Sequence, residues 1–254
     1  MKSAFDEIAA GYDAAFTSTR IGSLMREAVW RHTDRRFQPG SRILELNCGT
    51  GEDAIHFAAS GIRVLATDAS AEMVKIASGK IAQEQLSSLV EVRQLAWEEL
   101  DRLGELEFDG ALSNFGGLNC VESLSSAAAA LARRLRPGAP VLLCAMGPLY
   151  PWEWMWFLLH GRPSKAFRRL RAARWRGIDV HYPSIGAVKR AFAPHFQFRR
   201  ASAIGALLPP PYAEPFAARW PALIKSLSRW ERRIESVPPL PWLSDHYLLE
   251  LERK

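Results

Sequence analysis

The 254-residue sequence predicts an α/β protein with a Rossmann-like, seven-stranded and mostly parallel sheet that has helices on both faces. Over residues 38–146, strand-like apolar runs alternate with helical patterns, which is typical of a doubly wound parallel sheet. A glycine-rich turn, Gly49-Thr50-Gly51, follows the first run. Asp68 ends the second run about 20 residues further on, a spacing typical of folds that bind an adenosine-containing ligand.

The elements of this first half follow in a regular order. Ser70 is expected to cap the second helix with its hydroxyl, and Pro137-Gly138 to end the third. The helices are expected at 52–60, 70–78 and 123–135. The strands are expected at 42–47, 62–68, 89–95, 108–114 and 139–146.

Residues 147–243 differ in character, since they hold seven of the nine tryptophans and most of the prolines. A helix starting near Ser184, a strand at 196–204 and a final strand at 246–253 continue the regular pattern. We therefore expect one domain over 1–254. Its core comprises about 38–146, 184–204 and 244–254, and helical insertions of about 147–183 and 205–243 are expected over the active site.

Composition narrows the class of protein. No apolar run approaches the roughly 20 residues that span a bilayer, and the first residues do not resemble a secretion signal. Cys48, Cys120 and Cys144 form no CxxC pair, so we expect free thiols and a cytoplasmic location. We expect no metal site, because no HxH or HExxH spacing occurs. The net charge of +6 permits an acidic partner without indicating nucleic acid.

The stretch ILELNCGTGEDA, residues 43–54, fits two kinds of ligand loop. One cradles the pyrophosphate of a dinucleotide, and the other holds S-adenosylmethionine. Glu45 favours the second, because a carboxylate in a buried strand needs a cation or donors and would repel a pyrophosphate. The ammonium group of S-adenosylmethionine could supply that cation.

Residues 5–146 resemble the class I S-adenosylmethionine-dependent methyltransferases, whose first motif is acidic-x-G-x-G-x-G. Glu45, Gly49 and Gly51 match this motif, and Asn47 stands at its first glycine. Asn tolerates positive φ better than most residues, so we expect a left-handed backbone at Asn47. The resemblance also includes FDEIAAGYDAAF, FDGALSNFGGLN and LRPGAPVLL, and it fades after residue 147.

The resemblance implies a sheet whose last strand is antiparallel and inserted beside the fifth. It also implies S-adenosyl-L-methionine as the cofactor and a role for each matched residue. The methionine end would meet Glu45, Asn47, Gly49 and Gly51. Asp68 would bind the ribose hydroxyls. The adenine would lie among Ala69, Met73, Ala96 and Trp97. The methyl group would lie beside Asn114 and Phe115, and Tyr12 would cover the sulfonium.

The acceptor is expected to be a bulky, largely apolar small molecule, natural-product or lipid-like, that is methylated on oxygen, nitrogen or carbon. The aromatic insertions suggest a lid over such a ligand, with at least two of their tryptophans beside the sulfur. Candidate general bases are Tyr150, His181 and His246. The tryptophans expected to form the lid are Trp152, Trp154, Trp156, Trp220, Trp230 and Trp242.

Two other functions stay open: an NAD(P)-dependent oxidoreductase and a non-catalytic protein that binds an adenosyl ligand. Nucleic-acid methylation is disfavoured, because no N/D-P-P-Y/F tetrapeptide follows the fourth strand. The basic segment 162–176 is interpreted as a solvated helix face. Contact of this segment with a membrane surface or an acidic substrate is the less favoured alternative. The oligomeric state is not predicted.

Overall fold

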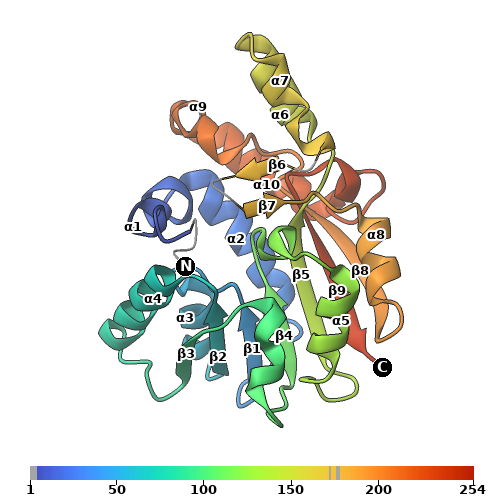
Figure 1. The fold of residues 1–254 in the computed structure, drawn as a ribbon. Coiled ribbons are helices and arrows are strands. Elements are labelled where there is room, and N and C mark those ends of the chain that lie inside the picture. The colour runs from blue at the N-terminus through green and yellow to red at the C-terminus, as the bar shows by residue number, and fades with distance from the viewer. Residues whose placement is uncertain (1–4, 172, 176–177) are drawn as a thin grey trace.

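The computed structural model describes residues 5–171, 173–175 and 178–254. A seven-stranded sheet with the order β3-β2-β1-β4-β5-β9-β8 runs through the molecule (Figure 1). Strand β9 is antiparallel to both of its neighbours, and the other pairs between β1 and β5 are parallel. This confirms the Rossmann-like sheet and the expected place of the last strand. The strands are β1 (Arg42–Leu46), β2 (Arg63–Asp68), β3 (Val90–Gln94), β4 (Gly110–Ser113), β5 (Pro140–Met146), β8 (Phe196–Ile204) and β9 (His246–Arg253).

Helices cover both faces of the sheet because the side chains of each buried strand alternate between two apolar clusters. Leu44 and Leu46 of β1 belong to the cluster that includes α5 and α8, whereas Ile43 belongs to the cluster with α2, α3 and α4. These helices are α2 (Arg20–Thr33), α3 (Glu52–Ala59), α4 (Ala71–Gln83), α5 (Leu124–Ala132) and α8 (Ile185–Phe192).

Serine caps begin several of these helices. Ser70 accepts a hydrogen bond from the backbone N–H of Met73 at 3.2 Å, as predicted. Helix α4 continues to Gln83, five residues beyond the predicted end at Ser78, because Met73, Ala77 and Ile81 keep one apolar face buried at four-residue spacing.

Short helical segments lie before α2, between β3 and β4, and between β4 and α5. The N-terminal segment forms α1 (Ala9–Tyr12) and a π-helical turn, η1 (Asp13–Thr17). Two 3₁₀ segments, η2 (Trp97–Leu103) and η3 (Gly117–Cys120), follow β3 and β4. Both 3₁₀ segments therefore begin near the carboxyl ends of parallel strands, where ligands bind in this class of sheet.

The two insertions contain short helices and one small hairpin, and Figure 1 shows most of them beyond the carboxyl end of β5. Among the residues that the structure describes, no helix has the length and apolarity that a bilayer span requires. The first insertion has α6 (Pro151–Leu159), α7 (Pro163–Ala166), η4 (Arg168–Leu170), β6 (Ala173–Trp175) and β7 (Ile178–Val180). The second has η5 (Pro211–Ala213), α9 (Glu214–Arg219), α10 (Pro221–Ile234) and η6 (Leu240–Leu243).

The basic segment 162–176 is not one solvated helix, so that interpretation is wrong. Pro163 starts the four-residue helix α7, and the chain then turns through η4 into β6. Two of its cations point inward: Arg168 and Arg169 both pair with the buried Glu153 of α6. Ala172 and Arg176 of this segment lie outside the described residues.

Candidate active site

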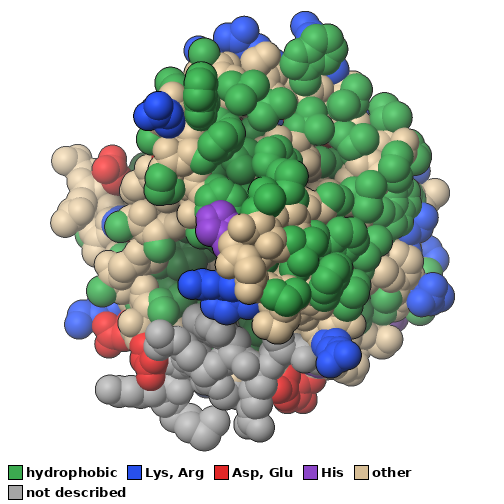
Figure 2. All heavy atoms as spheres, turned by 90° about the horizontal axis from the view of Figure 1, so that it is seen from above, with side chains coloured by type: hydrophobic (Ala, Val, Ile, Leu, Met, Phe, Trp, Pro, Cys, Tyr) green, Lys and Arg blue, Asp and Glu red, His purple; other side chains and the backbone are tan. Residues whose placement is uncertain are grey.

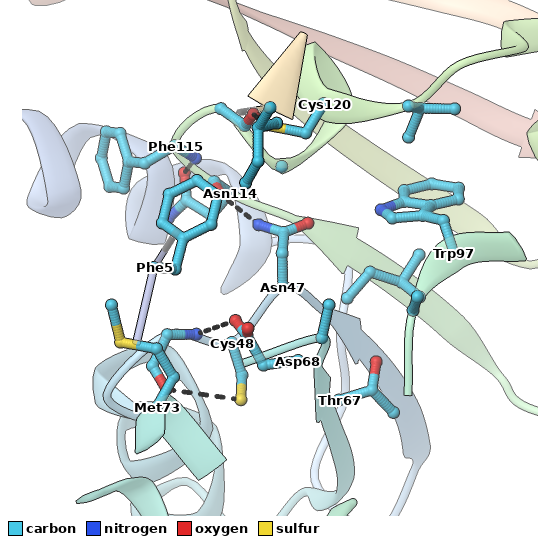
Figure 3. Close-up of a pocket in the computed structure, with 18 of the residues that line it drawn as sticks. Phe5, Asn47, Cys48, Thr67, Asp68, Met73, Trp97, Asn114, Phe115 and Cys120 are labelled. Carbon is cyan, nitrogen blue, oxygen red and sulfur yellow. Dashed lines mark hydrogen bonds between the residues drawn. The ribbon is translucent and has the colours of Figure 1, made fainter. Parts of the chain in front are cut away.

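A cavity of about 620 Å³ lies at the carboxyl ends of β1, β2, β3 and β4. It includes the point where the order of the parallel strands reverses, between β1 and β4. In open α/β sheets this reversal creates the crevice that receives the ligand. Figure 3 shows side chains from the loops after all four strands converging there.

The loop after β1 owes its shape to three residues with positive φ. Asn47, Gly49 and Gly51 have φ of 52°, 55° and 86°, so the left-handed backbone expected at Asn47 is present. The Asn47 amide Nδ2 donates to the carbonyl of Asn114 at 2.7 Å (Figure 3), and its Oδ1 accepts from the Ser113 hydroxyl at 2.6 Å. Asn47 therefore fastens the end of β1 to the end of β4, and it also lines the cavity.

Asp68 holds the neighbouring turn and lines the same cavity. Its two carboxylate oxygens accept backbone hydrogen bonds from Gly49 and Ser70, each at 2.9 Å. Burial raises the pKa of Asp68, and those backbone donors only partly offset the rise. Each carboxylate oxygen keeps a further lone pair, so Asp68 can also accept hydrogen bonds from two ligand hydroxyls.

The wall formed by the ends of β2 and β3 is mostly apolar. Trp97 has an indole Nε1 that is buried and has no hydrogen-bond partner among the described residues. A buried donor without a partner is costly, and in a cavity wall it is a ready contact for a ligand. The apolar lining residues here are Ala69, Met73, Leu95 and Ala96, and Thr67 and Glu98 are polar lining residues of the same wall.

Glu45 and Gly51 are outside the cavity lining, so their contact with the methionine end of the cofactor stays a prediction. Glu45 is 1% exposed within β1, and its Oε2 has no partner among the described residues. Burial, together with the nearby Asp53, raises its pKa well above the ordinary value. Gly51 instead permits close helix packing, because a Cβ there would lie 3.0 Å from the Cβ of Ala77 in α4.

The structure contains a buried polar network around Asp53 that was not predicted from the sequence. Asp53 of α3 pairs with Arg26 of α2 at 2.8 Å and accepts hydrogen bonds from the Trp30 indole at 2.7 Å and the Asn114 amide at 2.9 Å. Arg26 also lies over the Phe115 ring, 5.0 Å from its centroid. Arg26, Asp53, Asn114 and Phe115 all line the cavity, so α2 contributes to a site that the motif alone assigns to the loops.

The N-terminal segment covers the loop after β1, as the resemblance implied. Tyr12 lines the cavity, and so does Phe5 (Figure 3). Asp13 anchors the segment by accepting from the Thr50 hydroxyl at 2.6 Å and pairing with Lys80 at 2.6 Å. This cover shields one side of the cavity from water.

The side of the cavity beyond Asn114 and Phe115 is mainly apolar. It is formed by the β4–η3 loop, the end of β5 and the first insertion. Its polar side chains are Tyr182 and Arg168, and Arg168 makes a bidentate ion pair with Glu153 at 2.8 and 3.1 Å. The apolar or weakly polar lining here comprises Cys120, Val121, Met146, Ile178 and Val180.

None of the three candidate bases lines this cavity. Tyr150 is fully buried, and its hydroxyl donates to the carbonyl of Leu208 at 2.9 Å. His181 is exposed. His246 is buried against the edge of the Phe115 ring, with Nδ1 3.4 Å from the Asp245 carboxylate. A role as general base therefore stays a prediction for all three groups.

The six tryptophans that were expected beside the sulfur are also outside the cavity lining, so the structure does not support the expected aromatic lid. Trp156 stacks on His160 within α6, and Trp220, Trp230 and Trp242 are exposed. Among the described residues, the tryptophan that lines the cavity is Trp97, which belongs to the core and not to an insertion. The first insertion does contribute a wall, through Arg168, Ile178, Val180 and Tyr182, but the second does not.

Comparison with known proteins identifies the family. Residues 43–138 match the family described as "Methyltransferase domain". A demethylmenaquinone methyltransferase from Clavibacter sepedonicus is 31% identical over 145 residues, which cover 55% of each chain. A ubiquinone/menaquinone biosynthesis C-methyltransferase, UbiE, from Geotalea daltonii is 28% identical over 145 residues, 55% of this chain and 60% of that one. The aligned region thus spans little more than half the length of these curated relatives.

Solved structures share the fold across nearly the whole chain. Geranyl diphosphate C-methyltransferase from Streptomyces coelicolor A3(2), in complex with S-adenosyl-L-homocysteine, has a TM-score of 0.60 and 14% identity and covers 92% of this chain and 77% of its own. The [4+2]-cyclase SpnF has a TM-score of 0.55 and 16% identity, and covers 98% and 81%. At such identities the likeness concerns the fold alone.

The fold, the glycine-rich loop and the family match together define the class. The domain at residues 43–138 belongs to the class I S-adenosylmethionine-dependent methyltransferases, and S-adenosyl-L-methionine is the methyl donor of this class. This match decides between the two interpretations of the loop after β1 and leaves the dinucleotide oxidoreductase without support.

Proposed function

We propose that the chain transfers a methyl group from S-adenosylmethionine to an oxygen, nitrogen or carbon nucleophile of a small, largely apolar acceptor. The observation that carries this proposal is the two-part cavity. One part has an aspartate and an unpartnered indole donor, and the other is an apolar chamber at the end of β4 and β5.

The residues present fit the cofactor. Asp68 has lone pairs for the two ribose hydroxyls, and the Trp97 Nε1 has no competing partner among the described residues. Arg26 and Asp53 suit the carboxylate and ammonium of the methionine end, because each is held in place by the other. Ala69, Met73 and Ala96 offer the apolar contacts that an adenine ring needs.

When bound, S-adenosylmethionine supplies an electrophilic methyl group on a sulfonium. The contribution of the chain is then alignment and exclusion of water, which together can supply about 7–11 kcal/mol. Asn114 and Phe115, fixed by Asp53 and Arg26, would hold the acceptor beside the methyl group. Methyl transfer forms the bond from the acceptor to carbon and breaks the bond from carbon to sulfur. The proton of the acceptor passes to water; the three candidate bases do not line the cavity, and no other lining residue is assigned as a base.

The acceptor chamber supports an apolar molecule with one acidic or hydrogen-bonding group. Met146, Ile178 and Val180 provide the apolar wall, and Arg168 with Tyr182 provide the polar contacts. The names of the relatives, which include demethylmenaquinone and geranyl diphosphate methyltransferases, support an apolar acceptor. An enol or phenol would suit Arg168, because the cation favours the ionised form of the nucleophile.

A methyl-transfer assay tests this function. The purified chain is incubated with methyl-labelled S-adenosylmethionine and a panel of quinols, phenols, terpenoids and fatty acids. We expect label in an organic-extractable product together with release of S-adenosylhomocysteine, and loss of both in Asp68→Ala. Binding of S-adenosylhomocysteine without transfer to any extract fraction would indicate the non-catalytic alternative instead.

A further inference from the structure

The two insertions expose an apolar surface that the cavity does not use. Twelve large hydrophobic side chains are strongly exposed among the residues that the structure describes, and all twelve lie in residues 151–171 or 207–243. Leu159 is 78% exposed and Trp230 is 55% exposed. Trp220 and Trp242 are exposed as well. We call the exposed side chains of these two segments the insertion surface.

The exposed charge of the same two segments has one sign. They contain ten Lys and Arg residues, of which nine are exposed. Their four acidic residues are all at least partly covered. Glu153, Glu231 and Glu235 are buried, and Glu214 accepts backbone hydrogen bonds from the start of α2. The insertion surface thus combines exposed tryptophan and leucine with cations and has no exposed carboxylate.

Figure 2 looks onto the end of the molecule where the insertions lie. Hydrophobic side chains gather over much of this face, and Lys and Arg side chains stand mainly toward its edges. In α10, the Arg233 guanidinium lies 5.1 Å from the centroid of the Trp230 ring, so a cation and an indole are presented together. Contiguous exposed apolar patches of this kind usually mark a docking surface.

We propose that the insertion surface binds the surface of an anionic phospholipid bilayer. Trp and Leu side chains insert at the boundary of headgroups and acyl chains, and surrounding cations are attracted to anionic lipid. Stable attachment of this kind needs both contributions, and the two segments supply both.

The charge pattern argues against a second copy of the chain as the occupant. In a two-fold symmetric dimer the same patch faces itself. Nine exposed cations would then meet across the interface, with no exposed carboxylate of these segments to neutralise them. Like charges placed together across an interface are unfavourable, whereas an anionic bilayer complements them.

The surface also adjoins the cavity. Arg168 lines the cavity, and its neighbours Phe167 and Leu170 are exposed on the insertion surface. One turn of chain is therefore both cavity wall and docking surface. An apolar acceptor dissolved in the bilayer would have a short route to the cavity, although bilayer binding itself does not depend on the proposed methyl transfer.

The test is flotation of the full chain with vesicles, without cofactor or acceptor. Vesicles of phosphatidylcholine alone are compared with vesicles containing phosphatidylglycerol, at low and high salt. We expect binding to the phosphatidylglycerol vesicles that weakens with salt. Arg229→Glu/Arg232→Glu should weaken it by at least about tenfold. The matched control Arg63→Glu/Lys75→Glu, exposed cations outside both segments, should retain it.

The apolar contribution is tested separately with Leu159→Ser/Trp230→Ser. Both side chains are exposed, so circular dichroism should show an unchanged fold, while vesicle binding falls and becomes more sensitive to salt. The proposal is overturned if the wild-type chain ignores anionic vesicles, or if both double variants bind like the wild type. It is equally overturned if light scattering shows a dimer that these apolar substitutions dissociate. A failed methyl-transfer assay affects none of these outcomes.

Discussion

Asn47 combines a backbone role and a side-chain role at the cavity. Its positive φ shapes the loop after β1, and its amide joins that loop to Ser113 and Asn114. Gly117 belongs to the same contact, since a Cβ there would overlap the Asn47 amide. The residue was predictable as a left-handed position, but its link to β4 was not, because sequence spacing does not say which strands are neighbours.

Substitutions at Asn47 should separate these two roles. Asn47→Gly keeps the backbone conformation and loses two hydrogen bonds, so we expect a loss of about 1–2 kcal/mol in the free energy of unfolding. Asn47→Val also forces a β-branched residue to positive φ, which adds about 1–3 kcal/mol. Urea denaturation measures both. Equal losses in the two variants would show that backbone conformation is unimportant here.

Trp97 offers a test of ligand contact at a single atom. Its Nε1 has no partner among the described residues, so Trp97→Phe should weaken S-adenosylhomocysteine binding by about tenfold if this group donates to the ligand. Trp30→Phe is the matched control. The Trp30 Nε1 already donates to Asp53, so that variant should chiefly lose stability. Unchanged affinity in Trp97→Phe, measured by calorimetry, would exclude the contact.

Helix α2, strand β9 and the end of α10 meet at a buried histidine. His32 Nδ1 lies 2.9 Å from Glu250 and its Nε2 lies 3.0 Å from Glu235. Burial disfavours the imidazolium, but the hydrogen bonds to both glutamates outweigh it and raise the pKa of His32. Burial likewise opposes ionisation of Glu250, yet hydrogen bonds from His32 and Arg36 lower its pKa to about 2. The three elements are therefore joined by charge as well as by packing.

This junction predicts a pH dependence of stability. The contribution of His32 is complete below its unfolded pKa of about 6.5 and is lost as pH rises through the higher folded value. The contribution of Glu250 is present above its unfolded pKa of about 4.3 and is lost as pH falls toward about 2. His32→Gln should therefore cost about 2 kcal/mol at pH 6 and less at pH 9. Equal losses at both pH values, measured by denaturant unfolding, would contradict it.

Elements with a strong period or a clear cap could be predicted from sequence, and those fixed by long-range contacts could not. Strands β1 and β2 were predicted because each is a short apolar run between polar or glycine-containing segments. The start of α4 was predicted because Ser70 is a good N-cap residue. The structure of segment 162–176 was not predicted, because Arg168 and Arg169 form ion pairs with Glu153, which lies in another helix. No local pattern records such a pairing.

In the molecule as a whole, part of the cofactor side of the cavity followed from the motif, because Asn47, Gly49 and Asp68 line the cavity where β1 and β2 end. The motif residues Glu45 and Gly51 do not line it. The network of Arg26 and Asp53 was missed because it joins two helices whose packing the sequence does not specify. Sequence position likewise did not indicate that Tyr150 and His246, which lie near the carboxyl ends of the strands in sequence, are buried outside the cavity lining. The exposed tryptophans were assigned to a lid over the acceptor because they lie in long insertions after strands that end at the cavity.

The central claim is that this cavity holds an adenosyl ligand on Asp68. It is tested most directly by calorimetric titration of the wild-type chain and Asp68→Asn with S-adenosylhomocysteine, with NADH as the comparison ligand. The account predicts micromolar binding to the wild type, a loss of about 1.5–3 kcal/mol in binding free energy for Asp68→Asn, and no binding of NADH. Equal affinity of both proteins for S-adenosylhomocysteine, or tight binding of NADH alone, would contradict it.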